Sequence, residues 1–137
     1  MQPAIRAARS GDLPAVLALW QQAQAEPSHT DNLASLQQLV AHDPGALLVA
    51  DAGNHLVGSV IAAWDGWRGT IYRLAVAPSH RRQGLACRLL TEAENRLAAL
   101  GATRLQAIVV QSDQRATGFW RATSWAEQEE RVRFTAG

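Results

Sequence analysis

The segment from Leu74 to Leu100 constrains the fold of this chain more than any other part of the sequence. Its first residues, LAVA, have the apolar pattern of a buried strand, and Pro78 ends that pattern. A long helical pattern follows Gly84, and Gly101 is a natural place for that helix to stop. Because a further strand pattern comes next, at Thr103–Val110, the segment predicts a parallel strand–helix–strand crossover.

The patterns around this crossover alternate between helical and strand spacing. The order is strand, helix, helix, three strands, helix, strand, helix, strand, which predicts an α/β (α+β) domain with a mixed sheet. No repeat or linker divides the chain, so residues 1–137 are expected to form a single domain. The predicted strands are Ala4–Ala8, the two halves of Ala46–Trp64 around a turn at Ala52–Asn54, Thr70–Ala77, Thr103–Val110 and Trp125–Phe134, and the predicted helices are Ser10–Gln24, Thr30–Asp43, Gln83–Gly101 and Gln114–Ser124. Asp12 is the expected N-cap of the first helix, and Thr30 or Asp31 that of the second.

Composition narrows the classes of function. A net charge of +1 gives no general attraction to nucleic acid or to an anionic membrane, so neither is an expected partner. The apolar runs are too short for a membrane helix, and the first residues lack a signal-peptide core. The one cysteine, Cys87, excludes an intramolecular disulfide and a thiolate zinc cluster, and its side chain is expected to be buried. A cytoplasmic protein without a bound metal is therefore expected.

The loop between the strand and the helix has the chemistry of a phosphate site. A helix start presents unpaired N–H groups and a partial positive charge. Gly84 has no side chain to block these groups, and Arg81 and Arg82 add two full charges beside them. The alternative is an ordinary solvated loop. A P-loop or a dinucleotide fingerprint is disfavoured, because the chain lacks the lysine of the first and the glycines of the second.

The residues Arg81-Arg82-Gln83-Gly84-Leu85-Ala86 match the Gln/Arg-x-x-Gly-x-Gly/Ala motif of the GNAT superfamily of N-acetyltransferases, and the order of elements also resembles that family. The resemblance implies the GNAT fold, a sheet splayed at the CoA site and flanked by about four helices. It implies direct transfer of an acetyl group from acetyl-CoA to a primary amine in a ternary complex. The chain looks most like the small single-domain bacterial members of that family.

The resemblance also implies which residues hold acetyl-CoA. The backbone of Leu74–Val76 would pair with the pantetheine arm. The N–H groups of Arg82–Ala86 would hold the pyrophosphate. The neighbouring strand, Arg104–Val110, would have to splay away. A second family motif, Asn-x-x-Ala-x-x-Phe-Tyr, corresponds here to a run that starts with aspartate and ends with tryptophan. The implied set is Leu74, Ala75, Val76, Arg81, Arg82, Gln83, Gly84, Leu85, Ala86, Asp113, Ala116, Phe119 and Trp120.

The catalytic groups are less defined than the cofactor site. Trp120 occupies the position of the family's tyrosine, and its indole N–H can donate a hydrogen bond but cannot serve as a general acid. Tyr72 and Asp65 are the nearest candidates for a general base, although strand packing and a turn role are the competing interpretations. These departures keep a second hypothesis open, in which the protein is an acyl-CoA-binding sensor or interaction module with little turnover.

The acceptor site is predicted only in outline. In this fold the amine enters beside the first two helices, which makes Gln22–Ser35 the expected specificity segment. Glu26 and Asp31 in that segment, with Trp20 nearby, suit a cationic amine. The acceptor is expected to be a small-molecule amine or a protein or peptide amine, and the chain is expected to be a monomer or a homodimer.

Overall fold

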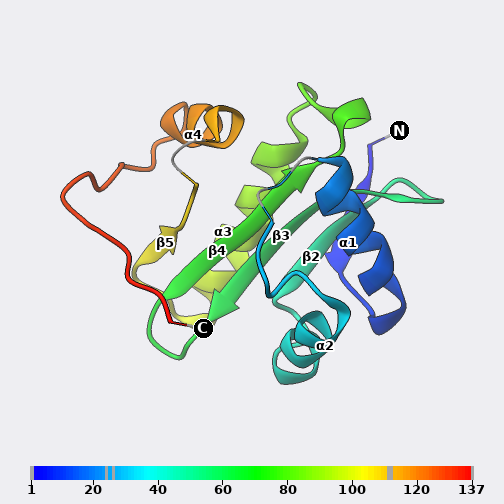
Figure 1. Cartoon of the computed structure of the whole chain (residues 1–137), viewed down its shortest axis with the longest axis horizontal. Coiled ribbons are helices and arrows are strands. Elements are labelled where there is room, and N and C mark those ends of the chain that lie inside the picture. The colour runs from blue at the N-terminus through cyan, green and yellow to red at the C-terminus, as the bar shows by residue number, and fades with distance from the viewer. Residues whose placement is uncertain (1, 24, 26, 111–112, 137) are drawn as a thin grey trace.

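The computed structural model describes residues 2–23, 25, 27–110 and 113–136, and its centre is a five-stranded sheet (Figure 1). The strands lie in the order β1-β2-β3-β4-β5, so each is hydrogen-bonded to its sequence neighbour. All pairs are antiparallel except β4 and β5, which are parallel because α3 connects them. The strands are β1 (Ala4–Ala7), β2 (Leu47–Asp51), β3 (Leu56–Trp64), β4 (Gly69–Val76) and β5 (Leu105–Ala107). The predicted crossover and the mixed sheet are therefore confirmed, and three of the four described strand pairs are antiparallel.

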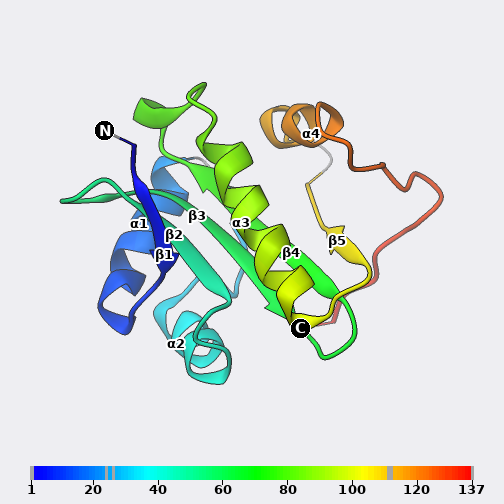
Figure 2. The ribbon, with the colours of Figure 1, turned by 180° about the vertical axis from the view of Figure 1, so that it is seen from behind.

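The described residues form four α-helices: α1 (Leu13–Gln22), α2 (Leu33–His42), α3 (Leu85–Leu100) and α4 (Gln114–Arg121). Helices α1 and α2 lie on one face and α3 on the other, as the front and back views show (Figures 1 and 2). Two short 3-10 turns, Ser10–Asp12 and Pro78–His80, precede α1 and α3. In the described part of the chain, none of the helices combines the length and apolar character needed to cross a bilayer.

The core covers both faces of β3 and of the first residues of β4, Gly69–Ile71. From α3, the buried residues Leu89 and Leu97 pack against the sheet, and each fully buried leucine contributes about 1.5–3 kcal/mol. The helix comes very close at Gly69, where an added Cβ would lie 2.7 Å from Leu97 Cδ1 and 2.8 Å from Leu105 Cδ2. A side chain at this position would have to displace the Leu97 and Leu105 side chains.

The C-terminal prediction is wrong. No strand forms in Trp125–Phe134, and two of its apolar residues, Val132 and Phe134, are 79% and 92% exposed. The preceding strand β5 is also shorter than the predicted Thr103–Val110. A strand needs a neighbouring edge to complete its hydrogen bonds, and β5 offers only three residues as an edge.

The predicted helix caps also need correction. Asp12 lies at the cap position of α1, but its carboxylate makes no cap hydrogen bond there. It accepts instead from the Arg6 guanidinium at 2.8 Å and from the Arg9 N–H at 2.7 Å, and the Arg6 bond is the main reason that its pKa falls to about 2. Helix α2 is capped by Asn32, which accepts from the Ser35 N–H, rather than by Thr30 or Asp31.

Candidate active site

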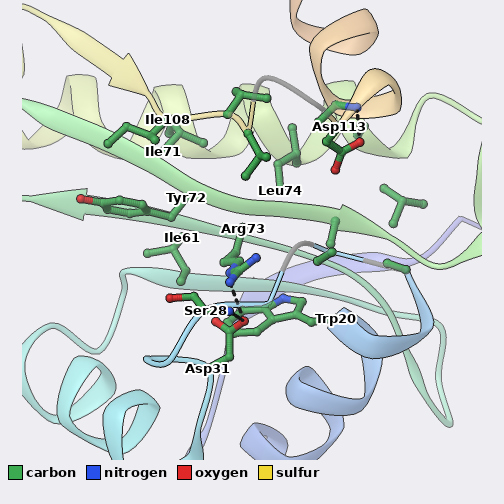
Figure 3. Close-up of a pocket in the computed structure, with 18 of the residues that line it drawn as sticks. Trp20, Ser28, Asp31, Ile61, Ile71, Tyr72, Arg73, Leu74, Ile108 and Asp113 are labelled. Carbon is green, nitrogen blue, oxygen red and sulfur yellow. Dashed lines mark hydrogen bonds and ion pairs between the residues drawn. The ribbon is translucent and has the colours of Figure 1, made fainter. Parts of the chain in front are cut away.

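A single large groove brings together most of the residues that the sequence singled out (Figure 3). Its volume is about 1470 Å³, above the roughly 300–1,000 Å³ of a typical small-ligand site, so it has room for two ligands. The walls come from the α1–α2 connection, β4, the start of α3, residues 108–110, α4 and the C-terminal tail at Arg133, Thr135 and Ala136.

The groove exists because β4 and β5 separate. Their ladder pairs Gly69 with Leu105, Thr70 with Gln106 and Ile71 with Ala107, and it stops there. Strand β4 continues to Val76, while the chain after β5 leaves the sheet and lines the opposite wall with Ile108 and Val110. Beyond Ile71, the side of β4 that faces β5 is therefore open to the groove, as the predicted splay requires.

A bulge in β4 lies in the middle of this open side. Ile61 of β3 pairs with Tyr72 and Ser59 pairs with Ala75, so two residues of β4 stand opposite one residue of β3. One of them, Arg73, has a φ of +51°, a conformation that non-glycine residues rarely adopt. The bulge breaks the alternation of the strand, and all six residues from Ile71 to Val76 line the groove.

Buried hydrogen bonds hold the bulge in place. The Arg73 carbonyl accepts from the Ser59 hydroxyl at 3.0 Å, and that hydroxyl accepts from the Trp20 indole N–H at 2.8 Å. Ser59 is fully buried and Trp20 is 4% exposed, so both bonds are shielded from water. Through these bonds, helix α1 is linked by way of β3 to the Arg73 carbonyl at the bulge.

The loop before α3 has an unusual backbone. Arg82 has a φ of +62° and Gly84 a φ of +77°, so two left-handed residues turn the chain into the helix. Gly84 is the N-cap of α3, and no side chain caps the helix there. An added Cβ at Gly84 would meet no protein atom within 4 Å, so its positive φ is what favours glycine. Arg82, Gly84, Leu85 and Ala86 line the groove, and Gln83 is an exposed loop residue outside its lining.

Arg81 connects this loop to the end of α1. Its guanidinium donates to the Ala23 carbonyl at 3.0 Å. Burial lowers the pKa of Arg81, the positive charge of Arg115 on α4 lowers it further, and Asp113 opposes them. Since all three charged groups line the groove, its loop end carries a concentration of positive charge that suits a polyanionic ligand.

Helix α4 contributes the aromatic wall. Asp113 caps it by accepting from the Ala116 N–H at 3.1 Å, as expected for an aspartate at that position. The Trp120 ring packs edge-on between Phe119 and Trp125, with centroid distances of 5.6 and 4.9 Å. Asp113, Ala116, Phe119 and Trp120 all line the groove, so the structure brings together both predicted motifs.

The two candidate bases have different locations. Tyr72 lines the groove on β4 and is 39% exposed (Figure 3). Asp65 does not line the groove; its carboxylate accepts from the N–H groups of Arg68 and Trp67 in the β3–β4 turn. Both bonds lower the pKa of Asp65, and the bond from the Arg68 N–H has the larger effect. Asp65 therefore has the turn role that was its competing interpretation.

The specificity segment reaches the groove with residues 27–31, Ser35 and its neighbours on α2. Asp31 accepts from the Arg73 guanidinium at 2.5 Å. Glu26, the other predicted carboxylate, lies outside the described residues. Cys87 is exposed on the groove wall, which corrects the expectation that it is buried. Within the described residues, no cluster of three or more His, Cys, Asp or Glu side chains could hold a metal ion.

Sequence reasoning missed Arg73 and Ser59 as parts of the site. Arg73 carries a detectable signal, because it is a charged residue inside the otherwise apolar strand TIYRLAVA. Ser59 carries little, since one serine within GSVIAAW is compatible with many strand environments. Only the pairing register reveals that its hydroxyl faces a bulge.

Comparisons with known proteins agree with this geometry. Residues 13–124 match the model of the Acetyltransferase (GNAT) family. An acetyltransferase of Pectobacterium atrosepticum is 32% identical over 116 residues, which cover 85% of this chain and 82% of that protein. The structure of AAC(6')-Iy with the bisubstrate analogue CoA-S-monomethyl-acetylneamine is similar with a TM-score of 0.74 and 20% identity, over 98% of this chain and 97% of that one. The ribosomal-protein-S18-alanine N-acetyltransferase of Escherichia coli is similar with a TM-score of 0.68 and 22% identity, over 89% and 76%.

Proposed function

The chain belongs to the GNAT family of acetyltransferases and transfers an acetyl group from acetyl-CoA to an amine, and we propose that it does so by direct attack within a ternary complex in this groove. The observation that carries the proposal is the uncapped start of α3, with its left-handed loop, beside the open side of β4. The start of α3 suits a pyrophosphate, and the open side of β4 suits an extended pantetheine arm. Both line the same groove.

In this proposal the backbone of Leu74–Val76 binds the pantetheine arm as an added strand would, because within the described residues β4 has no strand partner there on its open side. The N–H groups of residues 82–86 bind the pyrophosphate, and the helix dipole of α3 supports them. Arg81 supports the loop through Ala23, and Arg115 adds charge from α4. The thioester then lies near the bulge.

The chemistry is a nucleophilic substitution at the thioester carbonyl. The neutral amine nitrogen forms a bond to the carbonyl carbon, negative charge develops on the oxygen, and the carbon–sulfur bond breaks to release CoA thiolate. Backbone N–H groups on the open side of β4 would stabilise the developing oxyanion. The attacking nitrogen must lose a proton, and Tyr72 is the proposed relay: its phenol oxygen accepts that proton, directly or through water, while its own O–H proton passes to solvent, so the tyrosine stays neutral.

Trp120 does not supply a proton to the leaving thiolate in this proposal. Its indole packs between Phe119 and Trp125 and can at most donate a hydrogen bond. A thiol with a pKa of about 8.5 leaves readily as a thiolate, so protonation can follow from solvent. The role of Trp120 is then to shape the wall of the groove.

The acceptor is proposed to be a primary amine, either of a small molecule or of a protein or peptide. The similar proteins named above include one complexed with an acetylneamine analogue and one named for a ribosomal-protein alanine. We further propose one N-acetyltransferase domain over residues 1–137, a cytoplasmic location, and a monomer or homodimer.

Two measurements test the proposal. Isothermal titration should give micromolar or tighter binding of acetyl-CoA, and thiol release should rise with at least one amine among spermidine, kanamycin and a peptide with a free amino terminus. Absence of acetyl-CoA binding would refute it. Binding without release across a wider amine panel would favour the second candidate, an acyl-CoA sensor, for which the packing of Trp120 in place of an acid is the supporting observation.

A further inference from the structure

The acceptor side of the groove contains a segment that is hydrogen-bonded mainly to itself. In Pro27–Asn32, the Asp31 carboxylate accepts from the Ser28 N–H at 3.0 Å, and the Asn32 amide donates to the His29 carbonyl at 2.9 Å. Among the described residues, the hydrogen bond that ties this segment to the sheet is the one between Asp31 and Arg73 (Figure 3). Within the described residues, this ion pair therefore connects the segment to β4.

Arg73 is well suited to hold the segment in one position. Its guanidinium carbon lies 5.2 Å from the centroid of the Trp20 ring, and its carbonyl is bound by Ser59. The side chains of Arg73 and Asp31 are each only 19% exposed. A pair that is mostly shielded from water and fixed at both ends is screened less than a surface pair.

The other end of the same connection is also held by an arginine. Arg81, from the loop before α3, donates to the Ala23 carbonyl just after α1. The two arginines belong to the two elements proposed to bind acetyl-CoA, the β4 bulge and the phosphate loop. The segment between Ala23 and Asn32 is thus attached to the acyl-donor site at each end.

We propose that Arg73 is a positioning residue of the transfer reaction, which holds Pro27–Asn32 through Asp31 and thereby sets where the acceptor amine stands relative to the thioester. This inference rests on the proposed function of the groove. Its physical basis is that a displacement of about 1 Å in a bound reactant lowers the rate about 100-fold. Loosening the segment should therefore affect the amine and leave acetyl-CoA binding intact.

The chain offers variants that separate the side chain from the backbone. Asp31→Asn removes the charge but keeps an oxygen for the Ser28 N–H. Arg73→Gly removes the guanidinium and suits the positive φ, whereas Arg73→Ala removes it and keeps the strain. The two Arg73 variants should lose acceptor positioning alike, while Arg73→Gly should be the more stable of the two to urea.

A second ion pair provides the control. Arg96 and Asp43 form a pair of similar exposure, 18% and 25%, and neither residue lines the groove. Asp43→Asn thus breaks a comparable bond without touching the acceptor side. Any effect of ion-pair loss on general stability should appear in this variant as well.

Two readouts test the positioning role. In hydrogen exchange, the amides of residues 28–32 should exchange about tenfold faster in Asp31→Asn and Arg73→Gly than in the wild type, and remain unchanged in Asp43→Asn. With the panel amine that gives the fastest thiol release, the two variants should lower kcat/KM for that amine about tenfold or more. The acetyl-CoA affinity of Asp31→Asn should stay within about twofold of the wild type.

Wild-type exchange in residues 28–32 of Asp31→Asn and Arg73→Gly would overturn the inference, and so would an unchanged kcat/KM for the amine. An equal fall of kcat/KM for the amine in Asp43→Asn would also overturn it, because the effect would then be a general loss of stability. Failure of the wild type to bind acetyl-CoA would instead refute the proposed function. The exchange experiment distinguishes the two cases, since it needs neither acetyl-CoA nor an amine.

Discussion

The buried hydroxyl of Ser59 provides the sharpest test of how the site is built. Ser59→Ala would remove the acceptor of the Trp20 indole N–H at 2.8 Å and the hydroxyl that donates to the Arg73 carbonyl at 3.0 Å. An orphaned buried donor costs about 1–3 kcal/mol and the lost bond to the carbonyl about 1 kcal/mol, so the free energy of unfolding should fall by about 3 kcal/mol. Alanine fits where serine stood, so no steric term adds to this loss.

Urea unfolding followed by tryptophan fluorescence measures the effect. The midpoint should fall with an unchanged slope, because the surface exposed on unfolding stays the same. Trp20→Phe removes the indole N–H together with part of the ring and leaves Ser59 bound to Arg73. In a cycle of the two single variants and the double variant, the cost of the smaller ring cancels. We expect a coupling of about 1 kcal/mol between Trp20 and Ser59. A loss below about 0.5 kcal/mol in Ser59→Ala would refute the reasoning that this hydroxyl fixes the bulge.

Three further predictions concern the loop, the aromatic wall and the edge of the sheet. Gly84→Ala should weaken acetyl-CoA binding in titration calorimetry, since a left-handed alanine costs about 1–2 kcal/mol. The control is Gly53→Ala in the β2–β3 turn, where φ is +104° and an added Cβ also meets no atom within 4 Å. This variant should leave the affinity for acetyl-CoA unchanged. Trp120→Tyr should leave the rate of thiol release unchanged, because the leaving group departs as a thiolate, and a higher rate would show instead that leaving-group protonation limits turnover. The pKa of Asp12 is lowered from 3.8 to about 2, so its stabilising bond with Arg6 is complete above about pH 4 and is lost as the pH falls through 2. In acid unfolding curves, the stability advantage of the wild type over Asp12→Asn should therefore vanish between about pH 4 and pH 2.

Much of the fold follows from local pattern. The apolar spacing of α3 and the strand–glycine–helix order around Gly84 predicted the crossover, because both depend on residues close in sequence. The cap of α2 was missed because Thr30, Asp31 and Asn32 are all good cap residues, and tertiary contacts decide among them. Asp31 is engaged by Arg73, which leaves Asn32 as the cap.

The site was predicted only where a motif is contiguous. The loop Arg81–Ala86 can be identified from six adjacent residues, whereas the bulge depends on the register between β3 and β4. No periodicity in the sequence reveals that two residues of β4 stand opposite one residue of β3. The strand predicted at Trp125–Phe134 failed for the same reason, since its pattern was acceptable but the edge that it needed was too short.

The bulge means that β4 is one residue longer than its pairing with β3 requires. Removing Arg73 would leave Leu74 opposite Val60 and keep the pair of Ala75 with Ser59, which is the register of an unbroken hairpin. The shorter strand would shed a strained residue and would form a more regular sheet. It would also lose the widened backbone on which the thioester is proposed to rest. The bulge therefore lowers the stability of the sheet and keeps the backbone shape that the proposed reaction uses. Selection for a more stable sheet alone would remove Arg73, the residue that ties the donor site to the acceptor side.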